Sequence, residues 1–438
     1  MAEGQIVKME VDHTQAVATA IDKAKNTAAS NINLAIDELM VLEKQTRLDS
    51  DAISTGKLLE AMIEIIGDAK KWPWMNEHLV FMTKKRSQLK QAVTKMVQKA
   101  MTYLDLVPDK KTKLSLIDTL RSVTEGKIYV ELERARLTKQ LSDIREMDGD
   151  IEGACSVLLE LQVETYGSME KKEKVEFLLE QIRLCMLRKD YIRVQIQGDK
   201  INIKFFEGED TDDLKLKYYN LMIEVDYHNN NYINVCKHFY EIYSTKKVQD
   251  NENERFRALK NMVANLLLSP YDNEQSDLIN RRVTIRDLEK FPDFLDMMKS
   301  FIKNELINWK DFCGKYEKLV CSEVETFKGH PKRWEDLKSR VIEHNIRIIA
   351  LYYNRITIKR MSQLLELSEE LTEEYLSDLV IKKTVTAKID RLLFIVNFTE
   401  KKAPIDILND WSHNVNQLMG LINQTSHLIN KERVVHAI

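Results

Sequence analysis

The sequence predicts a mainly α-helical protein: an α-solenoid of helical-hairpin repeats with a period of about 40 residues, a winged helix, and a long C-terminal helix. Three observations support this fold class. The 438 residues include only 12 glycines and 6 prolines, about a third of average usage, which disfavours turn-rich β folds. Residues that cap helices recur at a fixed spacing. One strand-like segment follows two short helices near the C-terminus.

The repeat is marked by Asp or Asn residues at predicted helix N-caps. They are Asp109, Asp150, Asp190, Asn231 and Asp272, so successive marks lie 41, 40, 41 and 41 residues apart. Such side chains accept hydrogen bonds from unpaired N–H groups of the first helical turn. A second helical stretch lies between the marks, as in Lys127 to Glu146, Lys171 to Leu187, Leu214 to Tyr227 and Glu254 to Leu268. Two helices per repeat indicate a solenoid; chance spacing of caps is the alternative.

The winged helix is predicted from the change of pattern after Tyr353. Ile358 to Leu365 predicts a short helix, and Ser368 to Val380 predicts a second helix with a serine cap. Thr384 to Phe398 is rich in β-branched and apolar residues, and it predicts a β-hairpin with its bend at Asp390-Arg391. Two helices followed by a hairpin are the layout of a winged helix.

A long helix is predicted from Pro404 to Ala437, with proline near its start. Its apolar side chains repeat in steps of three and four residues, as a heptad seam does: Leu408, Trp411, Val415, Leu418, Ile422, Thr425 and Ile429. About 30 residues would span ~45 Å, which is longer than a small winged helix can cover. We expect this seam to join helices of other chains; folding back on its own solenoid is the alternative.

These patterns divide the chain into three parts. Residues 1–224 form an N-terminal helical solenoid. Residues 225–402 form a second domain, with helical repeats over 225–355 and the winged helix over 356–402. Residues 403–438 form the C-terminal helix.

Composition limits the function classes. The net charge is −3, from 66 basic and 69 acidic residues, so no global field attracts nucleic acid or an anionic membrane. The cysteines are odd in number and form no Cys-x-x-Cys pair, which favours a reducing compartment: Cys155, Cys185, Cys236, Cys313 and Cys321. Met1 to Lys25 lacks the apolar core of a secretory signal, and the longest apolar run, Ile348 to Tyr353, is too short to cross a membrane. We expect a protein of the cytoplasm and nucleus.

No motif in the sequence predicts catalysis, a cofactor or a metal. Gly56-Lys57 lacks the glycine that a phosphate-binding loop needs five residues upstream. Cys236 and His238 are two residues apart, so on a helix they point to different faces, and His228 is separated from them by a turn. We therefore expect no enzyme activity and no cofactor.

Nucleic-acid binding is disfavoured by charge. The helix from Ser368 would be the recognition helix of the winged helix. It contains no Lys or Arg, but it carries five acids: Glu369, Glu370, Glu373, Glu374 and Asp378. Such a helix would repel phosphates in a major groove, and Lys359 and Arg360 on the preceding helix would not reverse this repulsion.

The layout is similar to that of the PCI domain, a module shared by the proteasome lid, the COP9 signalosome and a translation initiation factor. Longer strings resemble PCI subunits of the proteasome lid in particular. They include Ile117-Asp-Thr-Leu-Arg, Leu161-Gln-Val-Glu-Thr-Tyr-Gly-Ser-Met, Val341-Ile-Glu-His-Asn-Ile-Arg-Ile and Asn409-Asp-Trp-Ser. The second part, 225–402, would be the PCI domain. PCI wings often turn on a glycine, which Asp390-Arg391-Leu392 lacks.

The resemblance implies a non-catalytic structural subunit of the lid of the 26S proteasome regulatory particle. Its expected partners are other lid PCI subunits, the lid deubiquitinase pair, the ATPase ring and the α-ring of the 20S core, in a hetero-oligomer without nucleic acid or membrane. A PCI subunit of the COP9 signalosome is the alternative, followed by a nucleic-acid-binding winged-helix factor.

Two surfaces are expected to carry these contacts. One is the C-terminal seam. The other is the edge of the hairpin, where PCI relatives pair strands, so Ile395 and Val396 are expected at a subunit interface.

Overall fold

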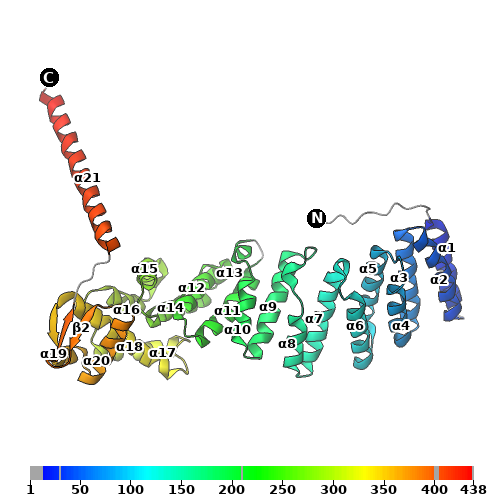
Figure 1. Ribbon diagram of the computed structural model, residues 1–438, viewed down its shortest axis with the longest axis horizontal. Helices are drawn as coiled ribbons and strands as arrows, with labels where there is room; N and C mark the ends of the chain where they lie inside the picture. The colour runs from blue at the N-terminus through cyan, green and yellow to red at the C-terminus, as the bar shows by residue number, and fades with distance from the viewer. Residues whose placement is uncertain (1–12, 29–30, 209–210, 399–403, 437–438) are drawn as a thin grey trace. The chain divides into compact units, whose positions relative to one another are not determined.

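The computed structural model of the chain describes residues 13–28, 31–208, 211–398 and 404–436 (Figure 1). Residues 1–12 of the N-terminal segment discussed above, the boundary between residues 402 and 403, and Ala437 lie outside the described residues. The chain divides into two compact units, residues 1–225 and 226–438. Helices dominate both units, and one small sheet lies near the C-terminus, so the predicted fold class of a helical solenoid with a winged helix is confirmed.

The N-terminal unit is a stack of helices in sequence order (Figure 1). The helices are α1 (Thr14–Ala28), α2 (Ile32–Leu48), α3 (Ala52–Asp68), α4 (Trp72–Thr83), α5 (Lys90–Thr102), α6 (Lys110–Thr124), α7 (Glu131–Met147), α8 (Ile151–Leu159), α9 (Lys171–Leu187) and α10 (Tyr191–Asp199). Helix α11 (Asp212–His228) contains the boundary between the units.

The C-terminal unit continues with further helices and ends in the winged helix and α21. Its helices are α12 (Tyr232–Ser244), α13 (Lys246–Asp250), α14 (Glu252–Leu268), α15 (Asn273–Arg282), α16 (Pro292–Ile302), α17 (Trp309–Glu323), α18 (Pro331–Tyr352), α19 (Ile358–Leu365), α20 (Glu369–Ile381) and α21 (Pro404–His436). Its strands are β1 (Arg355–Thr357), β2 (Ala387–Asp390) and β3 (Ile395–Phe398).

The predicted caps all stand at helix N-caps, and a common turn precedes three of them. Asp150, Asp190 and Asn231 each follow a residue with left-handed backbone, namely Gly149, Lys189 and Asn230. In each turn the cap residue's N–H donates to a carbonyl five residues back, which closes the preceding helix. The side chains of Asp150 and Asp190 then cap the next helix, whereas Asn231 makes no side-chain capping bond. The spacing of these three caps therefore coincides with one recurring turn.

Ion pairs join elements that lie one repeat apart in the N-terminal unit. We call them the repeat ion pairs: Arg121–Glu160 at 2.8 Å, Arg136–Glu173 at 2.8 Å, Arg183–Glu146 at 2.6 Å, Arg188–Glu152 at 3.1 Å and Lys200–Glu164 at 2.8 Å. Each partner is 36 to 39 residues from the other. Partly exposed pairs of this kind contribute about 0–1 kcal/mol each, so they add modestly to the stability of the stack.

Helix α18 contributes to two apolar cores of the C-terminal unit. Its Leu337 belongs to a core formed with α12, α14, α16 and α17. One turn further along, Ile342, Ile346 and Ile349 belong to the core of the winged helix, together with side chains of α19, α20 and the sheet. The spacing i, i+4, i+7 places these three isoleucines on one face. A single helix thus fixes the winged helix to the last helical repeats.

The sheet has the order β1-β3-β2, and both pairings are antiparallel. Ile356 lies opposite Val396 on one side of β3, and Ile389 lies opposite Val396 on the other. The hairpin was predicted, but β1 was not, because three residues after a helix give too little alternation to signal a strand. The sheet edges therefore lie on β1 and β2, and β3, which carries Ile395 and Val396, is the central strand.

Candidate interaction surfaces

The expected interface residues of the hairpin lie at different depths. Val396 is fully buried in the core of the winged helix, and Ile395 is half-buried on the central strand. The expectation that Ile395 and Val396 form a strand edge therefore needs correction: β1 occupies the side of β3 that a partner strand would need. Within the described residues, the unpaired edge of the hairpin belongs to β2.

The tip of the wing exposes three consecutive apolar side chains. Leu392 is 91% exposed, and Leu393 and Phe394 are also largely exposed. Asp390 Oδ1 accepts from the N–H groups of Leu392 and Leu393 at 3.1 and 3.2 Å, which closes the turn without glycine. Phe394 completes the turn with a φ of 52°, a left-handed backbone that costs about 1–2 kcal/mol for a residue with a Cβ. The turn thus keeps Leu392, Leu393 and Phe394 exposed to solvent despite the unfavourable backbone conformation of Phe394.

Helix α21 exposes every side chain that the structure describes on it. The seam residues predicted from the heptad pattern are among them, with Trp411 66% exposed, and the others are Leu408, Val415, Leu418, Ile422 and Ile429. Apolar side chains in steps of three and four lie on one face of a helix. The helix therefore carries a continuous apolar face that no described residue of this chain covers.

The acids of α20 lie on the surface of the winged helix. Ser368 caps this helix, as predicted, and accepts from the N–H of Leu371. Glu373 pairs with Arg391 of the wing at 2.6 Å. No Lys or Arg lies on α20, so this face repels phosphates as the sequence indicated.

Other groups that could carry chemistry have structural roles. Asp143, Glu146 and Glu180 lie together, but Arg183 bonds both Glu146 and Glu180, at 2.6 and 2.5 Å, and burial raises the pKa of Asp143. The cluster is therefore an ion-pair network around Arg183.

The residues considered for a metal site or a phosphate loop are likewise part of the fold. Cys236 is buried, and burial raises its pKa to about 12. His238 Nε2 lies 2.9 Å from a carboxylate oxygen of Asp226, away from that thiol's core position. Gly56 lies within α3, where its Cα faces Ala92 and Lys95 of α5. It serves close helix packing and not a loop.

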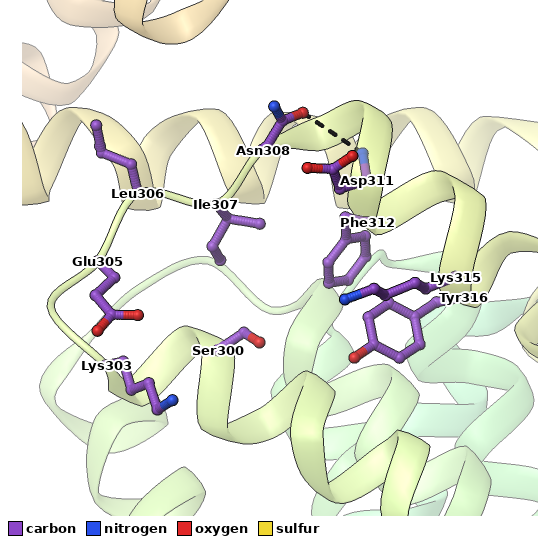
Figure 2. Close-up of a pocket in the computed structure, with 10 residues that line it drawn as sticks. All are labelled: Ser300, Lys303, Glu305, Leu306, Ile307, Asn308, Asp311, Phe312, Lys315 and Tyr316. Atoms are coloured by element: carbon purple, nitrogen blue, oxygen red, sulfur yellow. Dashed lines mark hydrogen bonds between the residues drawn. The ribbon is translucent and has the colours of Figure 1, made fainter.

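A small cavity of about 280 Å³ lies beside the loop between α16 and α17 (Figure 2). Its lining balances Lys303 and Lys315 with Glu305 and Asp311, so it favours neither sign of charge. Figure 2 shows Asn308 above Asp311, whose N–H bonds the Asn308 side chain at the start of α17. The polar groups of this cavity therefore serve the loop and the helix cap.

No helix in the described part of the chain is long and apolar enough to cross a membrane.

Three family models match successive parts of the chain. The N-terminal model of PSMD12/CSN4 matches residues 34–251, the PCI domain matches residues 309–400, and the C-terminal domain of 26S proteasome regulatory subunit RPN5 matches residues 406–437. The second match contains the winged helix, and the third coincides with α21. The chain is thus a PCI-domain protein, with a helical-repeat arm and a terminal helix of its own.

Relatives match over nearly the full length. The 26S proteasome regulatory subunit RPN5 of Saccharomyces cerevisiae is 40% identical, over all of this chain and 99% of its own length. The 26S proteasome non-ATPase regulatory subunit 12 of Dictyostelium discoideum is 42% identical, over 92% of this chain and 90% of its own. Subunit rpn501 of Schizosaccharomyces pombe is 41% identical over 98% of both. The chain belongs to the family of 26S proteasome regulatory subunit RPN5, also named non-ATPase regulatory subunit 12.

Proposed function

We propose that this chain is a non-catalytic structural subunit of the lid of the 26S proteasome regulatory particle. It supports ATP-dependent degradation of ubiquitinated proteins through lid assembly and contacts with neighbours, not through chemistry of its own. The observation that carries this proposal is the uncovered apolar face of α21, in the segment that matches the RPN5 C-terminal domain.

An amphipathic helix that lacks a partner is marginal in water, because most helical stability in proteins comes from packing of the apolar face. The seam of α21 follows the spacing that helices use to pack against each other. Helices from other lid subunits are its partners in this proposal, and the interface residues are Leu408, Trp411, Val415, Leu418, Ile422 and Ile429.

The winged helix supplies the second contact. The free edge of β2 can accept a strand, and the wing tip Leu392 to Phe394 presents apolar side chains beside it. The interface on the winged helix is therefore the edge of β2, and not Ile395 and Val396 on the central strand. Neighbouring PCI subunits of the lid are the partners of this surface.

The remaining partners are the lid deubiquitinase pair, the ATPase ring and the α-ring of the 20S core, which the helical-repeat arm would reach. The complex acts in the cytoplasm and the nucleus. Each of the three parts of the chain makes its own contacts in this proposal: the solenoid of residues 1–224, the PCI domain of residues 225–402 and the bundle helix of residues 403–438.

The test is native purification of the tagged chain, followed by mass spectrometry of its partners. We expect lid subunits and 20S α-subunits to copurify. Truncation after Lys402 should leave the solenoid and winged helix folded, because their cores lie upstream, but should lower incorporation into the lid on a native gel. Unfolding of the truncated free chain would contradict the proposed role of α21.

A COP9 signalosome subunit is the less supported alternative. The N-terminal family model carries the joint name PSMD12/CSN4, whereas the relatives described above are all named as proteasome subunits. Copurification with 20S α-subunits separates these two functions. The acids of α20 disfavour the third function, a nucleic-acid-binding factor.

A further inference from the structure

A cleft of about 1100 Å³ in the C-terminal unit has a strongly cationic lining. Its walls come from the ends of α11 and α14, the start of α12, the first half of α18 and Lys382, which directly follows α20. Four cationic side chains line it, Lys332, Arg333, Arg340 and Lys382, and Asp336 is the only carboxylate among its described lining residues. The whole chain has a net charge of −3, so this excess of positive charge is local.

Arg333 is held in place by a buried polar network behind the cleft. Its guanidinium lies over the ring of Tyr227, 4.2 Å from the ring centroid, and donates to the carbonyl of Thr326 at 2.6 Å. The Asn265 amide donates to both the Tyr227 and the Thr326 hydroxyls, at 2.8 and 3.0 Å. A cation fixed in this way loses little conformational entropy when a ligand binds.

Arg340 and Lys382 share one counter-ion. Their nitrogens lie 2.8 and 3.5 Å from the carboxylate of Glu343, which is itself buried. The Nε of Arg340 is buried and has no hydrogen-bond acceptor in the described structure. Asp336 accepts from the Tyr232 hydroxyl at 3.3 Å. The four cations therefore have only two carboxylates nearby, Asp336 and Glu343, and Glu343 already pairs with both Arg340 and Lys382.

The start of α18 adds to the positive potential of the cleft. His330 stands at the N-cap but makes no side-chain capping bond, and the first turn contains no acid. This turn carries Lys332 and Arg333, next to the positive end of the helix dipole. Anions are favoured at such an end, and cations are disfavoured there. An incoming carboxylate would relieve this imbalance.

We propose that the cleft binds a short acidic segment of a partner protein. The walls combine cations with the apolar and aromatic surfaces of Tyr227, Tyr232, Leu268, Pro270 and Pro331, a combination that suits a peptide with both carboxylates and apolar side chains. The volume far exceeds that of a single phosphate. A long polyanion such as RNA would pass the exposed acids of α20, whose last residue directly precedes Lys382. This inference goes beyond the proposed function and does not depend on it.

The probe for the test is a fluorescein-labelled octapeptide of alternating Glu and Asp with one Phe. Its binding to the full chain is measured by fluorescence anisotropy in 50 and 200 mM salt. The double variant Lys332→Gln and Lys382→Gln removes two exposed cations and spares the network around Arg333. Lys299→Gln removes an exposed lysine of α16 and is the matched control.

We expect the peptide to bind the wild-type chain, more weakly at the higher salt. The double variant should bind about tenfold more weakly, as expected for the loss of two exposed charge contacts, and the control should bind as the wild type does. A peptide with Gln and Asn in place of the acids should not compete. Absence of binding, equal binding to the double variant, or tighter binding of an oligonucleotide of the same charge would each overturn the proposal.

Discussion

Asn345 and Ile307 are joined by two hydrogen bonds. Asn345 Nδ2 donates to the Ile307 carbonyl at 2.9 Å, and Asn345 Oδ1 accepts from the Ile307 N–H at 2.8 Å. One side chain of α18 thereby satisfies both backbone groups of a residue in the α16–α17 loop. His344 adds a third bond to the same loop, from its Nε2 to the carbonyl of Glu305 at 3.3 Å. The loop is consequently tied to α18 by hydrogen bonds, although most of its residues are exposed.

Asn345→Leu should destabilise the C-terminal unit by about 2–3 kcal/mol. Leucine keeps a similar volume but leaves a backbone donor and a backbone acceptor unpaired, each at a cost of about 1–3 kcal/mol. Urea unfolding followed by circular dichroism measures the loss. Asn308→Ala, which removes only the cap of α17, should cost about 1 kcal/mol and serves as the control. Equal effects of the two substitutions would contradict the special role of Asn345.

The stability of the chain should fall in mild acid because of His344. Burial, helped by the nearby charge of Arg347, lowers the pKa of His344 to about 4, and the imidazole is therefore neutral in the folded protein at pH 7. The unfolded pKa is about 6.5, so this stabilisation is complete above that pH and is lost as the pH falls toward 4. Between pH 7.5 and pH 5 we expect a loss of about 2 kcal/mol.

His344→Phe provides the comparison for this pH effect. The ring of His344 lies 5.5 Å from that of Phe301, so phenylalanine can occupy the same aromatic position without a titrating group. The variant should show a shallower pH dependence of its urea midpoint, whatever its stability at pH 7.5. Parallel curves for the two proteins would show that other groups cause the acid sensitivity.

Thiol reactivity should divide the cysteines by burial. Cys321 is exposed and should react first with Ellman's reagent, whereas Cys155, Cys185 and Cys236 are buried and should react only after unfolding. Burial raises the pKa of Cys185 to about 12, with a further contribution from Cys155, whose sulfur lies 3.6 Å away. Since the thiolate is the nucleophile, both the burial and the raised pKa of a buried thiol slow the reaction. Cys321→Ser should remove the fast phase; its persistence would contradict this assignment.

Ile422→Asp should lower incorporation into the lid without lowering the melting temperature of the free chain. Ile422 is half exposed on α21 and belongs to the seam, so a charge there is buried only when partner helices pack on it, at a cost of several kcal/mol. Gln424→Asp introduces the same charge on another face of α21 and should assemble normally. A native gel of the assembled lid compares the two. Equal incorporation of both variants would remove the seam from the interface.

Phe394→Gly separates the stability of the wing from its contacts. Glycine adopts a φ of 52° without strain, and the Phe394 carbonyl can still accept from the N–H of Ile358. The stability of the free chain should therefore change by less than about 1 kcal/mol, because the gain offsets the flexibility of glycine. Incorporation into the lid should fall, since the exposed ring is lost. Normal assembly would indicate that the tip makes no contact.

The periodicity of the sequence was sufficient to predict the helical repeats and the layout of the winged helix. All five predicted caps stand at helix N-caps, and in Asp150, Asp190 and Asp272 the side chain makes the local capping bond on which the prediction rests. Lys171 to Leu187 is matched by α9 to the residue. The partner of β3 could not be predicted in this way. Arg355 to Thr357 is too short to show a period, and its pairing with β3 joins segments about 40 residues apart.

The cationic cleft could not be predicted from the sequence either. Lys332 and Arg333 are adjacent in sequence, but Lys382 joins them only through the packing of α20 against α18. A net charge near zero concealed the local excess. The run Pro331-Lys332-Arg333 at the start of a helix was the one available signal, because cations are unusual at that end.

The repeat ion pairs of the N-terminal unit have a consequence for cooperativity. Every one of them links an element to the element one repeat further along, and the recurring turn is local to each hairpin. Stability in such an arrangement is a sum of terms between nearest neighbours. Loss of a terminal hairpin therefore removes its own contribution and one interface, while hairpins further along keep theirs. The N-terminal unit should therefore lose structure one hairpin at a time. Limited proteolysis should produce a series of fragments whose lengths differ by about 40 residues.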